Sequence, residues 1–184
     1  MSDRKLVAAA GKLKRIKRQG WLDAGMPGSE AESVADHSFR VAFIAAFIAP
    51  PPTLSNRAKG AGRARELDVL RMVRMALVHD LAEHSVGDLT PRSGVSRRKK
   101  ARMEEEVVRR FGNGEVLSLW KEFDENISPE ARLVHEADVL ERVIQAKEYA
   151  ARRTGKRLDR FWKGWRRQVR SARFRALMEA RVTR

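Results

Sequence analysis

Residues 67–84 read LDVLRMVRMALVHDLAEH and combine a regular apolar pattern with charged groups at one end. Apolar residues recur every three or four positions, the period of one face of an α-helix, at Leu67, Leu70, Val73, Leu77 and Leu81. We therefore expect one helix from Leu67 to about His84. On it, His79 and Glu83 would share a face, and Asp80 would lie about 100° round the axis.

Helical periodicity also dominates the rest of the chain, and no segment shows the sustained alternation of a strand. We expect further helices at about 6–16, 33–49, 97–111, 114–124, 129–153 and 157–182, with the helix at 33–49 mostly buried and an exposed loop at 53–65. The aromatic residues of 157–182 are expected to pack in the core rather than stack on bases. The fold class is all-α, a single-domain helical bundle over residues 1–184.

The composition restricts the class of protein. A chain of 184 residues with 42% hydrophobic residues can bury a substantial core, and the absence of cysteine excludes disulfides, thiolate metal sites and cysteine nucleophiles. The longest apolar run, 41–52, is shorter than the roughly 20 residues that a membrane span needs. The basic N-terminus has no secretory pattern. We expect a cytoplasmic protein without membrane contact.

The formal net charge of +15 is unevenly distributed along the chain. Residues 1–18 carry +6 and residues 151–184 carry +11, whereas residues 19–150 carry −2. Basic ends on a nearly neutral body are compatible with a nucleic-acid-binding protein. They are equally compatible with a solvated basic helix, or with basic helices that flank a phosphate-binding site.

Acidic and histidine side chains stand at apolar positions on three predicted helices. His37 follows Asp36 inside the apolar run of 33–49. His79 and Asp80 lie in the last part of the helix described above, and Asp138 lies on the apolar stripe of 129–153. Imidazole and carboxylate together suit a divalent first-row metal. One histidine, a His-Asp pair and one aspartate predict a metal site between helices.

These residues carry a resemblance to a known family. Glu32-Ser33-Val34-Ala35-Asp36-His37, then His79-Asp80-Leu81-Ala82-Glu83, Gly87-Asp88 and Ala137-Asp138 resemble the HD-domain metal-dependent phosphohydrolases, and more narrowly their 5′-deoxynucleotidase branch. Arg18-Gln19-Gly20-Trp21 is similar to that branch's N-terminal element. The resemblance covers about residues 12–150. The chain departs from the pattern at Leu22-Asp23-Ala24-Gly25, which leaves the substrate preference open.

The resemblance implies a fold of the HD-domain type and a role for each matching residue. The metal ligands would be His37, His79, Asp80 and Asp138. Glu83 would act on the attacking water, Asp88 would hold that water or a sugar hydroxyl, Arg18 would bind the phosphate, and Trp21 would pack near the deoxyribose. The implied reaction converts deoxynucleoside 5′-monophosphates to nucleoside and phosphate with cobalt, manganese or a similar divalent ion, in a homodimer.

Two alternatives remain. The chain could hydrolyse another phosphoester or nucleotide, or it could bind nucleic acid through its basic ends while the metal is only structural. The complete ligand set together with Arg18 favours an enzyme with a nucleotide substrate over a nucleic-acid partner, and the intact Glu83 and Asp88 disfavour an inactive scaffold.

Overall fold

A computed structural model describes residues 2–49, 66–152 and 158–179. Every regular element within these ranges is a helix, and their β contact is an isolated antiparallel bridge between Lys17 and Ser33. The all-α prediction is therefore confirmed. None of the helices in these ranges is long and apolar enough to cross a membrane. The predicted loop at 53–65 lies outside the described residues.

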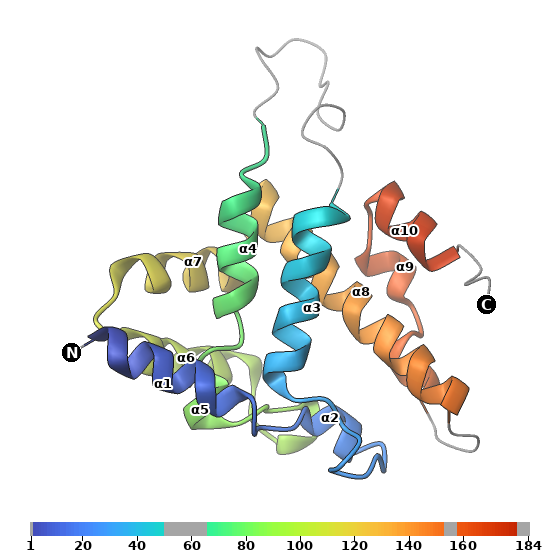
Figure 1. Cartoon of the computed structure of the whole chain (residues 1–184), viewed down its shortest axis with the longest axis horizontal. Coiled ribbons are helices and arrows are strands. Elements are labelled where there is room, and N and C mark those ends of the chain that lie inside the picture. The colour runs from blue at the N-terminus through green and yellow to red at the C-terminus, as the bar shows by residue number, and fades with distance from the viewer. Residues whose placement is uncertain (1, 50–65, 153–157, 180–184) are drawn as a thin grey trace.

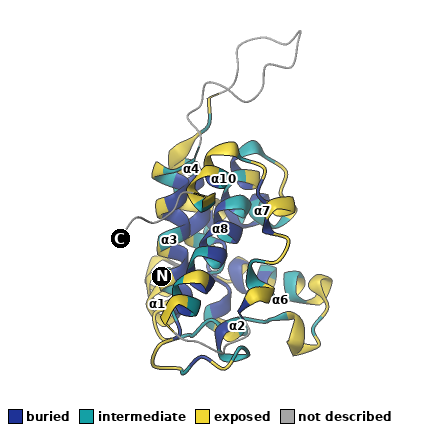
Figure 2. Cartoon of the chain, turned by 90° about the vertical axis from the view of Figure 1, so that its right-hand side faces the viewer, coloured by how far each residue is buried: buried dark blue, intermediate teal, exposed yellow. Residues whose placement is uncertain are grey.

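Three helices form the centre of the molecule, α3 (Val34–Phe47), α4 (Val69–Val78) and α8 (Pro129–Arg152). They pack against one another in all three pairs, and Figure 1 shows α3 and α4 side by side with α8 running obliquely behind them. Burial is concentrated on these helices in Figure 2. The core between them includes Val41, Ile44, Met72, Met75, Val134, Leu140 and Val143.

Shorter helices extend this centre on one side. They are α1 (Ser2–Leu13), α2 (Gln19–Leu22), α5 (Glu83–Val86), the 3₁₀ helix η1 (Pro91–Ser93), α6 (Arg97–Arg109) and α7 (Gly114–Glu125). A second apolar cluster joins α1, α6 and α7 through Leu13, Val108 and Trp120. The predicted helices at 33–49, 97–111, 114–124 and 129–153 agree with α3, α6, α7 and α8 to within a few residues.

A capping box starts α3 one turn before its histidine. The Ser33 hydroxyl accepts a hydrogen bond from the Asp36 backbone N–H at 3.1 Å, and the Asp36 carboxylate accepts one from the Ser33 N–H at 2.8 Å. This reciprocal pair satisfies two backbone donors at the helix terminus. It fixes where the helix begins, and therefore where His37 points.

The prediction of one helix from Leu67 to His84 is wrong, because α4 ends at Val78. The ring Nδ1 of His79 lies 2.7 Å from the carbonyl oxygen of Ala76, which the backbone N–H of Asp80 would bond if the helix continued. The chain then tightens into turns in which the N–H of Glu83 bonds the carbonyl of Asp80 at 3.0 Å. His79 and Glu83 therefore do not share a helix face.

The prediction of one C-terminal helix at 157–182 is also wrong within the described part. The 3₁₀ helix η2 (Asp159–Phe161), α9 (Trp165–Gln168) and α10 (Ala172–Glu179) take its place. Gly164 breaks the run with a φ of +78°, in the left-handed region that favours glycine. One straight helix would place Leu158, Trp165 and Val169 on one side and Phe174 on the other, whereas the breaks bury all four. The predicted core packing of the aromatic residues is confirmed for Trp165 and Phe174, whereas Phe161 and Trp162 are only partly buried.

The prediction that α3 is mostly buried fails for its phenylalanines. Phe39, Phe43 and Phe47 are 68%, 49% and 66% exposed, although Val34, Val41 and Ile44 on the opposite side are buried. Their spacing of four residues places the three rings in one stripe, with centroids 6.5 Å and 4.9 Å apart. The helix has two apolar faces, and this fold covers one of them.

Candidate active site

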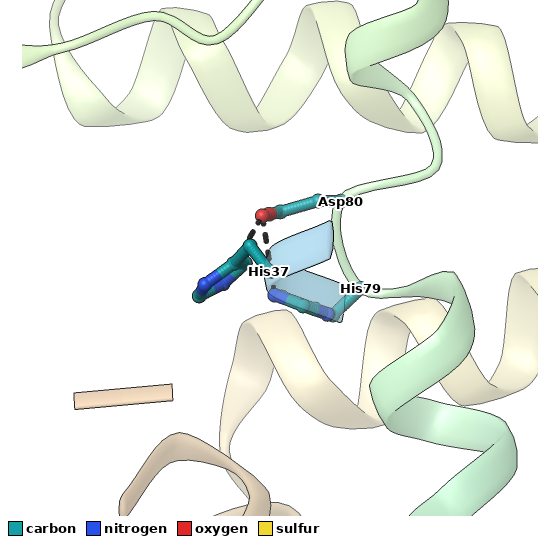
Figure 3. Close-up of side chains that lie close together, drawn as sticks. All are labelled: His37, His79 and Asp80. Atoms are coloured by element: carbon teal, nitrogen blue, oxygen red, sulfur yellow. Dashed lines mark ion pairs between the residues drawn. The ribbon is translucent and has the colours of Figure 1, made fainter. Parts of the chain in front are cut away.

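The structure brings the four predicted metal ligands together from three places in the fold. Oδ2 of Asp80 lies 3.2 Å from Nε2 of His79 and 3.7 Å from Nε2 of His37. Figure 3 shows these three side chains facing one another. Oδ1 of Asp138, on α8, lies 3.3 Å from the same nitrogen of His37. His37 comes from the first turn of α3, and the His79-Asp80 pair follows the end of α4.

These distances fit a divalent ion. With metal–ligand bonds of about 2.0–2.2 Å, two donors lie about 3 Å apart at a right angle and about 3.5 Å apart at a tetrahedral angle. Each ring also faces an acceptor with Nδ1, Glu141 for His37 and the Ala76 carbonyl for His79, which makes Nε2 the nitrogen that a metal ion would bind. Both Nε2 atoms are buried without a hydrogen-bond partner in the described residues.

A second cluster, formed by Glu32, His37 and Glu141, also has donors close enough for a metal. However, Nδ1 of His37 and Oε2 of Glu141 are only 2.5 Å apart. An ion bound to both atoms at about 2.1 Å would hold them closer to 3 Å apart. This contact is therefore a hydrogen bond, and the ion site lies on the Nε2 side of the ring.

The local charges favour a cation in this site. Burial raises the pKa values of Asp80 and Asp138, but His79 and His37, respectively, outweigh burial and lower both pKa values below the usual carboxyl range. Burial and Arg18 lower the pKa of His37, whereas Glu141 and Asp138 raise it to about 10. Ionised carboxylates that favour a proton on a neighbouring imidazole would also favour a metal ion in place of that proton.

Glu83 lies next to this cluster and is almost completely buried. Its Oε1 is 3.4 Å from Nζ of Lys100 on α6, and its Oε2 has no hydrogen-bond partner among the described residues. Burial, together with the charges of Asp80 and Asp88, raises the pKa of Glu83 well above its usual range. The side chain can therefore keep a proton at a pH where an exposed carboxyl group is ionised.

Arg18 and Asp88 lie beside the metal cluster. Nη1 of Arg18 donates to Oδ2 of Asp80 at 2.9 Å and lies 3.9 Å from Oδ1 of Asp88. The other oxygen of Asp88 accepts a hydrogen bond from the Gln19 N–H at 2.7 Å. The predicted phosphate-binding arginine is thus held next to the proposed ligand Asp80.

Trp21 forms the aromatic side of the site but is only 2% exposed. Its ring centroid lies 4.2 Å from that of Phe161 and 5.3 Å from that of Tyr149. Its Nε1 donates a hydrogen bond to Oε1 of Glu32 at 2.7 Å. Phe161 belongs to η2, so the C-terminal segment packs on the body of the domain next to the site.

A pocket of about 690 Å³ connects these groups. Its lining contains seven of the eight predicted site residues, Arg18, Trp21, His79, Asp80, Glu83, Asp88 and Asp138. His37 is fully buried behind it. The volume lies within the range of about 300–1,000 Å³ that is usual for small-molecule sites.

Sequence reasoning missed several residues of the site. Lys100 and Arg142 also line the pocket, and Glu141 contacts Nδ1 of His37, on the side of the ring away from the cluster. Glu141 had a usable signal, because it follows the buried Leu140 one turn after Asp138. Lys100 had none, because it lies within a run of four basic residues on a charged helix.

An all-α bundle with this His/Asp cluster defines the HD-domain class of protein, and the HD domain family model matches residues 10–176. The chain belongs to the HD-domain family. It is 34% identical over 146 residues to 5′-deoxynucleotidase HDDC2 of Dictyostelium discoideum, covering 76% of this chain and 73% of that protein. It has the same identity over the same length to human 5′-deoxynucleotidase HDDC2, of which it covers 64%.

Solved structures share this fold. A conserved hypothetical protein from Pyrococcus furiosus superposes with a TM-score of 0.76 at 35% identity, over 95% of this chain and 96% of that chain. The PH0347 protein from Pyrococcus horikoshii gives a TM-score of 0.75 at 35% identity, over 95% and 94% of the two chains. The predicted resemblance to the HD-domain phosphohydrolases and their 5′-deoxynucleotidase branch is confirmed, and family membership implies a divalent metal.

Proposed function

We propose that this chain is a metal-dependent 5′-deoxynucleotidase, which converts deoxynucleoside 5′-monophosphates to deoxynucleosides and phosphate. The observation that carries the proposal is the meeting of two histidines and two aspartates at a pocket that also holds Arg18 and Glu83. The names of the curated relatives support this choice of substrate. They favour the hydrolase over the nucleic-acid-binding alternative.

The proposed ligands are His37, His79, Asp80 and Asp138, and cobalt or manganese suits their mixed nitrogen and oxygen donors. Such an ion supplies Lewis acidity, making water acidic enough to attack at neutral pH and offsetting charge on the phosphoryl oxygens. Arg18 is proposed to bind the phosphate, because its planar guanidinium matches phosphate oxygens and stays protonated.

Glu83 is proposed to transfer a proton from the attacking water to the leaving O5′ oxygen. The water oxygen bonds to phosphorus, the bond from phosphorus to O5′ breaks, and one water proton must end on O5′. Glu83 has a raised pKa and lies at the pocket beside Asp80, so it can take this proton and return it. Asp88, anchored by the Gln19 N–H, is proposed to hold the water or a sugar hydroxyl.

The aromatic side of the pocket is proposed to receive the nucleoside, with Trp21 supporting Phe161 near the deoxyribose. Because Arg160, Phe161 and Gln168 also line the pocket, we propose that residues 1–184 form one HD domain rather than a core with a separate basic tail. The test is phosphate release from a panel of ribo- and deoxynucleoside 5′-monophosphates, 3′-monophosphates and nucleotides with more than one phosphate.

Faster release from deoxynucleoside 5′-monophosphates than from the other substrates is the expected result. A second candidate, hydrolysis of a more highly phosphorylated nucleotide, is favoured by the further cations of the lining, Arg92, Lys100, Arg142 and Arg160. A preference for such a nucleotide in the panel would replace the first proposal.

We further propose a homodimer that forms through the exposed stripe of α3. Phe39, Phe43 and Phe47 present an apolar surface, and Leu70 and Leu77 on the neighbouring α4 are also exposed. Exposed apolar clusters of this kind mark protein contact surfaces. A second copy of the chain would cover them symmetrically.

A further inference from the structure

We propose that Glu141 is a positioning residue, which holds the His37 ring with Nε2 toward the metal, and that Arg40 holds Glu141 in turn. The inference rests on the proposed metal-dependent function and deepens it. It extends the site from the four ligands to a row of charged groups between α3 and α8.

The contact between His37 and Glu141 is completely buried. Both side chains are fully excluded from solvent, and Oε2 of Glu141 lies 2.5 Å from Nδ1 of His37. Because a carboxylate accepts but does not donate, the shared proton belongs to Nδ1, and Nε2 is the nitrogen left to bind a metal ion. That nitrogen faces Asp138 at 3.3 Å and Asp80 at 3.7 Å.

The spacing of Asp138 and Glu141 on α8 lets both residues reach the ring of His37. Asp138 and Glu141 are three residues apart on α8, so their side chains leave the same face of the helix. Asp138 reaches Nε2 of His37 and Glu141 reaches Nδ1. Glu141 therefore holds Nδ1 while Asp138, from the same helix, faces Nε2, and a flipped ring would lose the contact between Nδ1 and Glu141.

Arg40 completes the row and neutralises the buried carboxylate. It follows His37 by three residues on α3, and its Nε and Nη2 donate to Oε1 of Glu141 at 3.0 Å and 2.8 Å. Its Nη1 donates to both oxygens of Glu148 at 3.0 Å and 2.9 Å, and Nη2 also contacts Gln145. A carboxylate bound on both oxygens keeps one orientation, and a buried carboxylate requires such a partner.

A carboxylate behind a metal-bound histidine sets the tautomer and orientation of the ring, and its loss typically lowers metal affinity by about 10–100-fold. A purely structural ion pair would instead change the stability of the metal-free protein and leave metal affinity unchanged. These two roles can therefore be separated by experiment.

The experiment compares Glu141→Gln with wild type and with the control Glu148→Gln, whose side chain contacts the outer end of Arg40 and is 41% exposed. Mn²⁺ affinity of the metal-free protein is measured by calorimetry, and the melting temperature is measured alongside. We expect Glu141→Gln to bind Mn²⁺ about 10–100-fold more weakly and Glu148→Gln to bind within about twofold of wild type. Unchanged affinity in a folded Glu141→Gln variant would overturn the inference.

A second measurement needs no variant at Glu141. Nitrogen-15 chemical shifts of His37 in the wild type, assigned with His37→Gln, report which ring nitrogen carries the proton. With Zn²⁺ or Cd²⁺ bound, we expect the proton on Nδ1 and the metal on Nε2. Metal on Nδ1 would overturn the inference even if Glu141→Gln fails to fold. If the wild type binds no divalent ion, the proposed function fails as well, whereas equal metal binding by wild type and Glu141→Gln removes only the role of Glu141.

Discussion

At the scale of single residues, each histidine of the site is defined by what its second nitrogen contacts. His79 lies against the Ala76 carbonyl at 2.7 Å, and this contact coincides with the end of α4. His37 lies against Glu141 on the opposite side of the cluster. These two Nδ1 contacts turn Nε2 of both rings toward Asp80, where a metal ion would bind.

Glu83→Gln tests the proposed proton carrier. Glutamine keeps the shape of the side chain but cannot transfer the proton, so we expect kcat to fall about 10²–10⁴-fold while Mn²⁺ affinity changes little. Stability should be maintained, because one oxygen of Glu83 is buried without a hydrogen-bond partner in the described residues. Steady-state kinetics and calorimetry check this expectation.

Glu104→Gln is the matched control, because Glu104 contacts the same Lys100 at 3.4 Å but does not line the pocket. It should retain near wild-type activity. An active Glu83→Gln enzyme, or equal losses in both variants, would contradict the assignment of the proton to Glu83.

Glu104 also provides a prediction of pH dependence. Burial raises the pKa of Glu104 to about 7, against the opposing charge of Lys100. Between pH 4.5 and 7 the folded protein retains a proton that the unfolded chain releases, so this group lowers the free energy of unfolding as pH rises. Glu104→Gln should therefore gain stability relative to wild type between pH 5 and pH 8. Urea unfolding of metal-free protein measures the difference, and a difference independent of pH would refute the shift.

At the scale of elements, apolar periodicity predicted the helices whose ends carry local signals. Ser33 caps α3, Asn113 caps α7 and Ser128 bonds the first turn of α8, and all three residues are readable from the sequence. The breaks at His79 and Gly164 were not predicted, because they depend on a side chain meeting a carbonyl and on the packing of η2 and α9 against α8.

Two glycines test the account of these elements with opposite signs. Gly164 adopts a φ of +78°, whereas Gly11 lies inside α1. A Cβ added at either position would meet no atom within 4 Å. Gly164→Ala should destabilise the protein by about 1–2 kcal/mol through backbone strain. Gly11→Ala should stabilise it by about 0.5–1 kcal/mol through helix propensity. Thermal unfolding checks both, and a stabilising Gly164→Ala would show that residues 162–165 do not turn as described.

At the scale of the whole molecule, the motifs predicted the ligand set, but side chains buried behind it could not be predicted from them. The pairing of Glu141 with His37 and with Arg40 becomes visible only when α3 and α8 lie together. Hydrophobicity also misassigned the phenylalanine stripe of α3, because it does not distinguish a face that packs inside the chain from one exposed on its surface.

The proposed dimer can be tested at that stripe. Phe43→Glu places a charge between Phe39 and Phe47, both within ring-contact distance of it, and should convert the dimer to a monomer in sedimentation equilibrium. Ile127→Glu is the control, because Ile127 is 63% exposed and lies in the turn before α8. A wild-type monomer, or a Phe43→Glu variant that remains dimeric, would contradict the proposed interface.

The central claim is that a divalent ion held by His37, His79, Asp80 and Asp138 is required for hydrolysis. The most direct measurement is phosphate release from a deoxynucleoside 5′-monophosphate by chelator-treated protein before and after addition of Co²⁺ or Mn²⁺, with Asp138→Ala beside the wild type. Activity should be absent without metal, return with metal in the wild type, and stay absent in Asp138→Ala. Hydrolysis by metal-free wild type, or by Asp138→Ala at the wild-type rate, would contradict the claim.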